Sequence, residues 1–211
     1  MRRVLAVSVF SILLLIGCGG GGGGNKQPDY HGRCDYSVLN PYSRPPVDLV
    51  WYHNAQFNLD RTIRWPHRDV LIAVMDTRID RWALQQILDE INRYIYPTRL
   101  VVADVPPVYA DIEIWHNPVL DQLDWLGQCE WIFGAGNFLV KAIIEIADSP
   151  FYGCLFYAVL KHELLHAVGI FEHMTDGGVM NSPTYNDVIT PNVIDVLVPL
   201  YRFPAGTPVY P

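Results

Sequence analysis

Two histidines and a glutamate stand at the spacing that metal-assisted hydrolysis requires. The run HELLH at 162–166 places His162 and His166 four residues apart. On a helix such residues lie about 40° apart around the axis, so both imidazoles can reach one metal ion. Glu163 follows the first histidine, where its carboxylate can take a proton from a water that the metal activates. The pattern predicts zinc ligands at His162 and His166 and a general base at Glu163.

The residues that follow strengthen this interpretation. Gly169 lets the chain leave the helix, because a residue without Cβ can take the left-handed conformation at a helix end. His173 comes just beyond that turn, and a Gly-Gly-Val-Met sequence ends at Met180. The pentapeptide alone also occurs by chance in chains of this length, with histidines that only serve the core or the surface. Its combination with the glycine, the further histidine and the methionine favours a metal centre.

The segment 162–182 resembles the metzincin zinc metallopeptidases, whose pattern HExxHxxGxxH is followed by a turn that contains methionine. The similarity is closest to the matrixin-like branch. It covers about residues 69–203, and its specific motifs are confined to 162–182. The resemblance implies one catalytic zinc ion and hydrolysis of peptide bonds. It also implies an α+β domain, in which a twisted mixed sheet packs with an active-site helix and a C-terminal helix. Met180 is expected to pack beneath the metal.

The third ligand departs from the family spacing. The family position, three residues after Gly169, is Glu172, and His173 comes one residue later. Past the glycine the chain is no longer held to helical spacing, so the turn can absorb the extra residue. A neutral imidazole suits zinc at about 2.0 to 2.1 Å, although two histidines with one carboxylate also form an ordinary zinc site. We expect His173, with Glu172, Asp176 or no third protein ligand as the alternatives.

The N-terminal residues predict where the protein resides. Arg2 and Arg3 precede an apolar run, and Leu-Ile-Gly-Cys at 15–18 resembles a bacterial lipobox. We therefore expect a signal peptide at 1–17, a lipid on Cys18 and a flexible glycine tether at 19–24. A transmembrane helix is the alternative, but the uncharged run is short for about 30 Å of hydrocarbon. The residue after Cys18 is glycine rather than aspartate. In the Gram-negative lipoproteins that it resembles, this indicates anchoring in the outer membrane, facing the periplasm or the exterior.

Composition agrees with one domain behind this anchor. Fewer than 190 residues follow the signal and tether, enough for one sizeable core. We expect the lipidated cysteine, tether and N-terminal arm at 18–68 and one catalytic domain at 69–211. The net charge of −7 provides no basic surface for nucleic acid. The expected partners are a protein or peptide substrate and the membrane, and the chain is expected to be a monomer.

The remaining cysteines permit one disulfide in an oxidising compartment. Cys34, Cys129 and Cys154 are available, and we favour Cys129 with Cys154. The sequence around Cys34 faintly resembles the inhibitory cysteine of matrixin propeptides, but a structural or disulfide role is favoured.

Periodicity predicts the elements that would position the site. Strands are expected at 69–75, 99–102, 110–115 and 138–146, with a long loop at 117–136, and the last strand is a candidate edge for an extended peptide. A capping box from Thr77 to Asp80 is expected to open a helix that ends near Tyr94. Ser149 and Pro150 are expected to start the active-site helix, and Thr190 and Pro191 a terminal helix that Pro199 kinks or ends early.

The sequence therefore predicts a zinc metalloendopeptidase whose general base is Glu163. Two alternatives stay open. The first is a lipoprotein binding or assembly module that retains a zinc scaffold, which would not need Glu163. The second is a zinc amidase that acts on cell-wall material. Tyr185, beyond Met180, is expected to pack rather than to stabilise an oxyanion.

Overall fold

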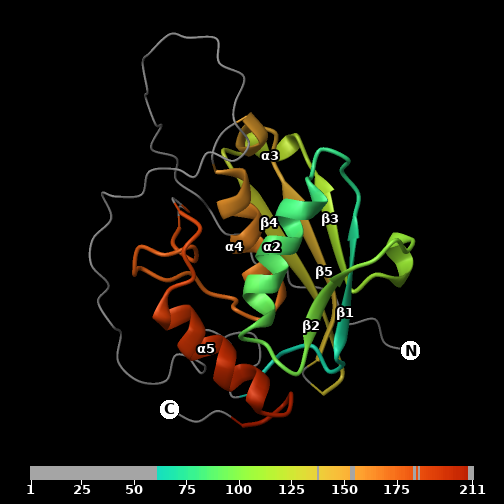
Figure 1. Ribbon diagram of the computed structural model, residues 1–211, viewed down its shortest axis with the longest axis vertical. Helices are drawn as coiled ribbons and strands as arrows, with labels where there is room; N and C mark the ends of the chain where they lie inside the picture. Colours follow the sequence, from blue (N-terminus) through green and yellow to red (C-terminus); the bar gives the residue numbers. More distant parts are fainter. Residues whose placement is uncertain (1–60, 137, 153–154, 183, 185, 209–211) are drawn as a thin grey trace.

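A computed structural model of the 211-residue chain describes residues 61–208, except for 137, 153–154, 183 and 185 (Figure 1). The signal peptide, Cys18, the tether and Cys34 lie outside the described residues, as do Cys154 and Tyr185. In the described part of the chain, none of the helices combines the length and the apolar character needed to cross a membrane.

A five-stranded mixed sheet forms the centre of the fold. Its order is β2-β1-β3-β5-β4, and its strands are β1 (Asp69–Val74), β2 (Arg99–Val102), β3 (Ile112–His116), β4 (Gly127–Gly134) and β5 (Phe138–Ile146). β2, β1, β3 and β5 are parallel, and β4 runs antiparallel to β5. The class is therefore α+β with a mixed sheet, as expected.

The prediction that 117–136 is a loop was wrong. This stretch contains a short helix, α3 (Val119–Gln122), and the whole of β4. Along β4 the side chains of Cys129 and Trp131 are buried, whereas Glu130 and Ile132 are exposed. This alternation is typical of a strand with one covered face. Because β4 pairs with β5, the expected edge strand is an inner strand, and β4 is the edge.

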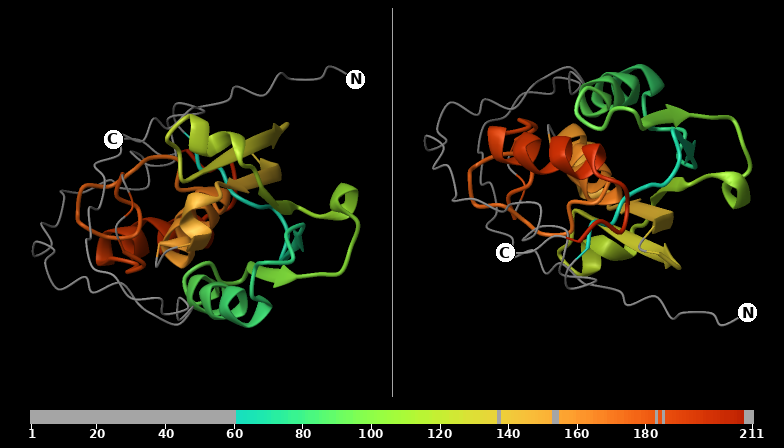
Figure 2. Two further views of the ribbon diagram at one scale, coloured as in Figure 1. Left: turned by 90° about the horizontal axis from the view of Figure 1, so that it is seen from above. Right: turned by 90° about the horizontal axis from the view of Figure 1, so that it is seen from below.

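Helices cover one face of the sheet (Figure 2). α2 (Arg81–Asn92) packs on β2, and α4 (Phe156–Ala167) packs on β4, β5 and α2. α5 (Pro191–Arg202) lies beyond α4 (Figures 1 and 2). One core joins the sheet to α2, α4 and α5.

Two helix starts differ from the sequence prediction. α2 begins at Arg81, and its cap is Asp80, whose carboxylate accepts hydrogen bonds from the amides of Trp82 and Ala83. The expected capping box at Thr77 was therefore wrong. The segment Ser149–Tyr152 is a separate 3-10 helix, and α4 starts only at Phe156.

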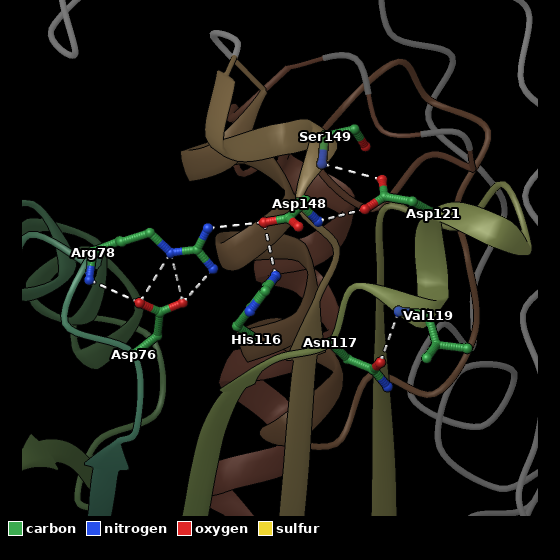
Figure 3. Close-up of polar contacts among 8 residues, drawn as sticks. All are labelled: Asp76, Arg78, His116, Asn117, Val119, Asp121, Asp148 and Ser149. Atoms are coloured by element: carbon green, nitrogen blue, oxygen red, sulfur yellow. Dashed lines mark hydrogen bonds and ion pairs between the residues drawn. The ribbon is translucent and has the colours of Figure 1, made fainter.

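The break after β5 has a visible cause. The Asp121 carboxylate accepts hydrogen bonds from the amides of Asp148 and Ser149 (Figure 3). On its other side Asp148 pairs with Arg78 at 2.8 Å, and Arg78 also binds Asp76. These contacts tie the ends of β1 and β5 together and direct the chain sideways before α4 begins.

α5 begins as predicted, with the Thr190 hydroxyl accepting from the amide of Val193 and with Pro191 at the first position. Pro199 does not end it. The helix continues to Arg202, and the amide of Phe203 donates to the carbonyl of Pro199. Buried side chains after the proline hold the last turn against the core, which offsets the hydrogen bond that proline cannot donate.

Candidate metal centre

The helix α4 carries the HELLH run through the interior of the domain. All its residues from Ala158 to Ala167 are buried. A helix that is apolar on nearly every side is stable only when other elements surround it. His162, Glu163 and His166 are each 2 or 3% exposed. Polar side chains so deeply buried need partners or a bound ion.

Three imidazole nitrogens converge on one point. The Nε2 atoms of His162 and His166 are 3.0 Å apart, and Nε2 of His173 lies 3.2 Å from the first and 3.3 Å from the second. Ligand atoms around a tetrahedral zinc ion at about 2.0 to 2.1 Å are separated by about 3.3 to 3.4 Å. The triangle of nitrogens is therefore close to the size that zinc requires, and the cluster could hold a metal ion.

On the side of the ring away from the cluster, His162 and His166 each bond a backbone carbonyl. Nδ1 of His162 lies 2.7 Å from the carbonyl of Val179, and Nδ1 of His166 lies 2.5 Å from the carbonyl of Ile170. A carbonyl only accepts, so both Nδ1 atoms carry the hydrogen and both Nε2 atoms keep a lone pair. A carbonyl bound to the other ring nitrogen in this way is typical of histidines that bind metal.

Burial keeps the imidazoles of His162 and His173 neutral. Burial, followed by the effect of His173, lowers the pKa of His162 to about 3. Burial also lowers the pKa of His173. Neutral imidazole is the form that binds metal, so neither of these two rings has to lose a proton near neutral pH.

The structure brings His173, and not Glu172 or Asp176, to the cluster. Gly169 has φ of +108°, and its amide donates to the carbonyl of His166, so the chain turns in the left-handed region after α4. Among the described residues, the group able to hold a metal consists of the three histidines alone. The buried Asp176 carboxylate instead accepts from the amide of Gly178 and from side chains of α5 and its cap.

Glu163, the residue after His162 on α4, lies in an apolar environment. Its side chain is 3% exposed, and burial raises its pKa to about 8. The adjacent start of β4, at Gly127, comes close to this carboxylate. A buried carboxyl with a pKa near neutrality can both accept and release a proton under physiological conditions.

Hydrogen bonds connect the turn at Met180 to the rest of the site. Met180 is fully buried, and its carbonyl accepts from the amide of Met174 at 2.8 Å. The Thr184 hydroxyl lies 2.8 Å from Nδ1 of His162 and donates to the carbonyl of Asn181. Sequence reasoning missed Thr184, because a threonine in a loop has no spacing that marks it as a partner of a distant histidine.

Lys161 was also missed. Its ammonium group is buried and lies 2.6 Å from the Glu90 carboxylate of α2 and 2.7 Å from the carbonyl of Asp187. The contacts connect α4 to α2 and to the loop beyond Met180. A lysine that precedes the HELLH run reads as a surface residue until the packing of α2 is known.

Three aromatic side chains donate to consecutive carbonyls at the end of α4. The indole of Trp131 bonds the carbonyl of His166 at 3.0 Å, and the indole of Trp65 bonds that of Ala167 at 2.9 Å. The Tyr201 hydroxyl bonds the carbonyl of Val168 at 2.9 Å. The last carbonyls of a helix have no partner within it. We call these three residues the aromatic cap; it closes the helix between the second and third histidines.

Cys129 carries a free, buried thiol. The expected disulfide between Cys129 and Cys154 is therefore wrong. Burial, with smaller effects of Glu163 and Glu130, raises the pKa of the thiol well above its ordinary value. A thiol of this kind behaves as a small apolar side chain of the core.

Comparison with known proteins adds nothing to this geometry. No protein-family model matches the chain, and none of the curated proteins compared with it matches. The function of the site has to be inferred from its own residues.

Proposed function

We propose that the chain is a zinc-dependent metalloendopeptidase of the metzincin type. One observation carries the proposal. Three imidazole nitrogens face one another at 3.0 to 3.3 Å, and Glu163, the residue after the first of these histidines, is buried on the same helix. The order of elements also supports it, since the strand, helix, two strands and further strand that the resemblance implies before the HELLH helix are β1, α2, β2, β3 and β5, with β4 added between the last two.

His162, His166 and His173 would hold the ion through Nε2. A zinc ion with three protein ligands acts as a Lewis acid and lowers the pKa of a bound water towards about 7. The Glu163 carboxylate accepts a proton from the attacking water and later delivers it to the nitrogen of the leaving amine. Its buried position excludes bulk water from both transfers. Thr184 and the carbonyl of Val179 keep the His162 ring in one orientation.

An extended peptide is the proposed substrate. β4 is an edge strand that packs on α4. Its part from Gly127 to Trp131 lies next to Glu163 and His166. The free edge of such a strand binds an extended peptide through backbone hydrogen bonds. We further propose the lipid anchor at Cys18 and a location in the bacterial cell envelope, at the outer membrane, on the strength of the lipobox alone.

The test combines zinc quantification with cleavage of an unbiased peptide library by the purified protein. Glu163→Ala is expected to retain zinc and to lose at least about two orders of magnitude in kcat, the usual scale for general acid/base catalysis. Cleavage by this variant at the wild-type rate would contradict the mechanism. Stoichiometric zinc in a wild-type protein that cleaves nothing would favour a binding module.

The third ligand has a matched pair of variants. His173→Ala is expected to lose zinc under mild chelation, because one of three ligand atoms disappears. Glu172→Ala, one residue away, is expected to be the milder change, within the 10- to 100-fold that loss of a neighbour of the ligands costs. Zinc affinities in the opposite order would transfer the ligand role to Glu172.

A further inference from the structure

Gly127, the first residue of β4, faces the general base proposed above. Gly127 is buried, and it pairs with Ile146 of β5. An ideal Cβ on Gly127 would lie 3.0 Å from Oε1 and 3.1 Å from Cγ of Glu163, and 2.9 Å from Cγ1 of Val159. Non-bonded carbon atoms pack at about 3.5 to 4.0 Å. The site therefore has room for a glycine and for no other residue, unless a neighbour moves.

Backbone conformation does not explain the glycine. The residues with positive φ in the described part of the chain include four glycines, but Gly127 is not among them. A side chain at this position would thus be compatible with the backbone. Space alone excludes it, and Glu163 supplies two of the three close contacts.

The surroundings determine which neighbour would move. Val159 and Glu163 are four residues apart on α4, so both face β4. Val159 is 2% exposed and β-branched, which restricts its rotamers. The backbone of β4 is held by its register with β5, and that of α4 by the core. The Glu163 side chain has more rotatable bonds, so its carboxylate is the group that would be displaced.

We propose that Gly127 is a positioning residue for Glu163. The absence of a side chain lets the carboxylate lie against the β4 backbone, and this contact holds it beside the three histidines. The inference rests on the proposed function, in which Glu163 transfers the proton. Misplacement of a catalytic group by about 1 Å can cost about 100-fold in rate.

The first experiment compares two glycines of the same strand. Gly127→Ala is expected to lower kcat about 10- to 100-fold, with KM and zinc content unchanged. Gly134→Ala is the control, because its Cβ would crowd Val140 at 2.7 Å and has no contact with Glu163. It is expected to retain the wild-type kcat. Equal losses of kcat in the two variants would overturn the proposal, since they would indicate a general effect of crowding β4.

A second pair of variants separates the two neighbours of the added Cβ. Gly127→Ala combined with Val159→Ala removes the valine contact and keeps the contact with Glu163. The double variant is expected to remain as slow as Gly127→Ala. Recovery of kcat on removing Val159 would show that the valine, and not the carboxylate, mediates the effect, and would overturn the proposal.

A readout independent of activity is thermal unfolding of the zinc-free proteins. Gly127→Ala is expected to lower Tm in the wild-type background and to lower it less in the Glu163→Ala background, where the added Cβ finds space. Identical Tm shifts in both backgrounds would overturn the proposed contact. If the wild-type protein hydrolyses no peptide, the proposed function fails, whereas this unfolding cycle still decides whether Gly127 and Glu163 interact.

Discussion

The burial of Glu163 makes the stability of the zinc-free protein depend on pH in a predictable direction. The change to test is Glu163→Gln, which keeps the shape of the side chain and removes its ability to ionise. The carboxyl is 3% exposed, and burial raises its pKa from 4.5 to about 8. The unfolded chain has no such environment, so there the group ionises near its ordinary pKa.

The sign and size follow from these two values. Between pH 4.5 and about 8, the folded protein retains a proton that the unfolded chain has released. The wild-type free energy of unfolding therefore falls as pH rises through this window and levels off above it. At 1.36 kcal/mol per pH unit, the window of about 3.5 units corresponds to a loss of up to about 5 kcal/mol. This is a large part of the 5 to 15 kcal/mol typical of a domain.

The assay is urea unfolding followed by circular dichroism, in EDTA, from pH 5 to pH 9. The free energy of unfolding of Glu163→Gln should nearly equal that of the wild type at pH 5 and exceed it by several kcal/mol at pH 9. Protonation of His162 is common to both proteins and cancels in the difference. Glu130→Gln, at an exposed glutamate of β4, removes the same charge without removing a buried carboxyl, so its difference should lack this rise.

A stability difference between Glu163→Gln and wild type that is the same at pH 5 and pH 9 would refute the assigned burial. Excess zinc should reduce the difference at high pH, because a nearby cation favours the ionised carboxylate.

Three further predictions concern other parts of the molecule. Thr184→Val should weaken zinc binding about 10- to 100-fold, measured by competition with a chelator, because the His162 ring loses a partner. Thr184→Ser keeps the hydroxyl and should bind zinc like the wild type, and equal affinities in all three proteins would exclude this role. Tyr201→Phe should lower the free energy of unfolding by about 1 to 3 kcal/mol, because a buried carbonyl loses its partner, with zinc affinity unchanged; no loss in urea unfolding would refute the contact. Cys18→Ser should release the protein from the membrane fraction or leave an unprocessed precursor, and metabolic labelling without fatty acid on the wild type would refute the anchor.

The elements that could be predicted from the sequence are those encoded by a local residue pattern. The strands at 99–102 and 138–146 have the predicted bounds, because apolar runs bounded by turn residues signal strands directly. β4 was missed, since its glycines and tryptophan resemble a loop. Its role depends on pairing with β5, and a register between two strands cannot be read from either one alone.

In the candidate site, too, some residues could be predicted from local spacing and others depend on contacts with remote parts of the chain. The spacing of His162 and His166 follows from helical geometry, so their convergence was predictable. The choice of His173 over Glu172 depends on the path of the chain after Gly169, which the contacts of the Met180 turn determine. Thr184 and Lys161 carry no signal at all, because their partners come from remote parts of the chain.

The aromatic cap joins a short motif to the whole domain. Its donors come from the segment before β1, from the edge of the sheet and from the terminal helix, although the carbonyls that they bind are consecutive. A fragment that contains only the HELLH helix and the Met180 turn has the ligands but lacks these supports. We therefore expect the chain to bind metal tightly only when the whole domain is folded, as in other proteins whose metal binding is coupled to folding. If the chain is the proposed peptidase, an unfolded copy lacks the assembled metal site and cannot catalyse hydrolysis, but as an extended peptide it can serve as a substrate for a folded copy.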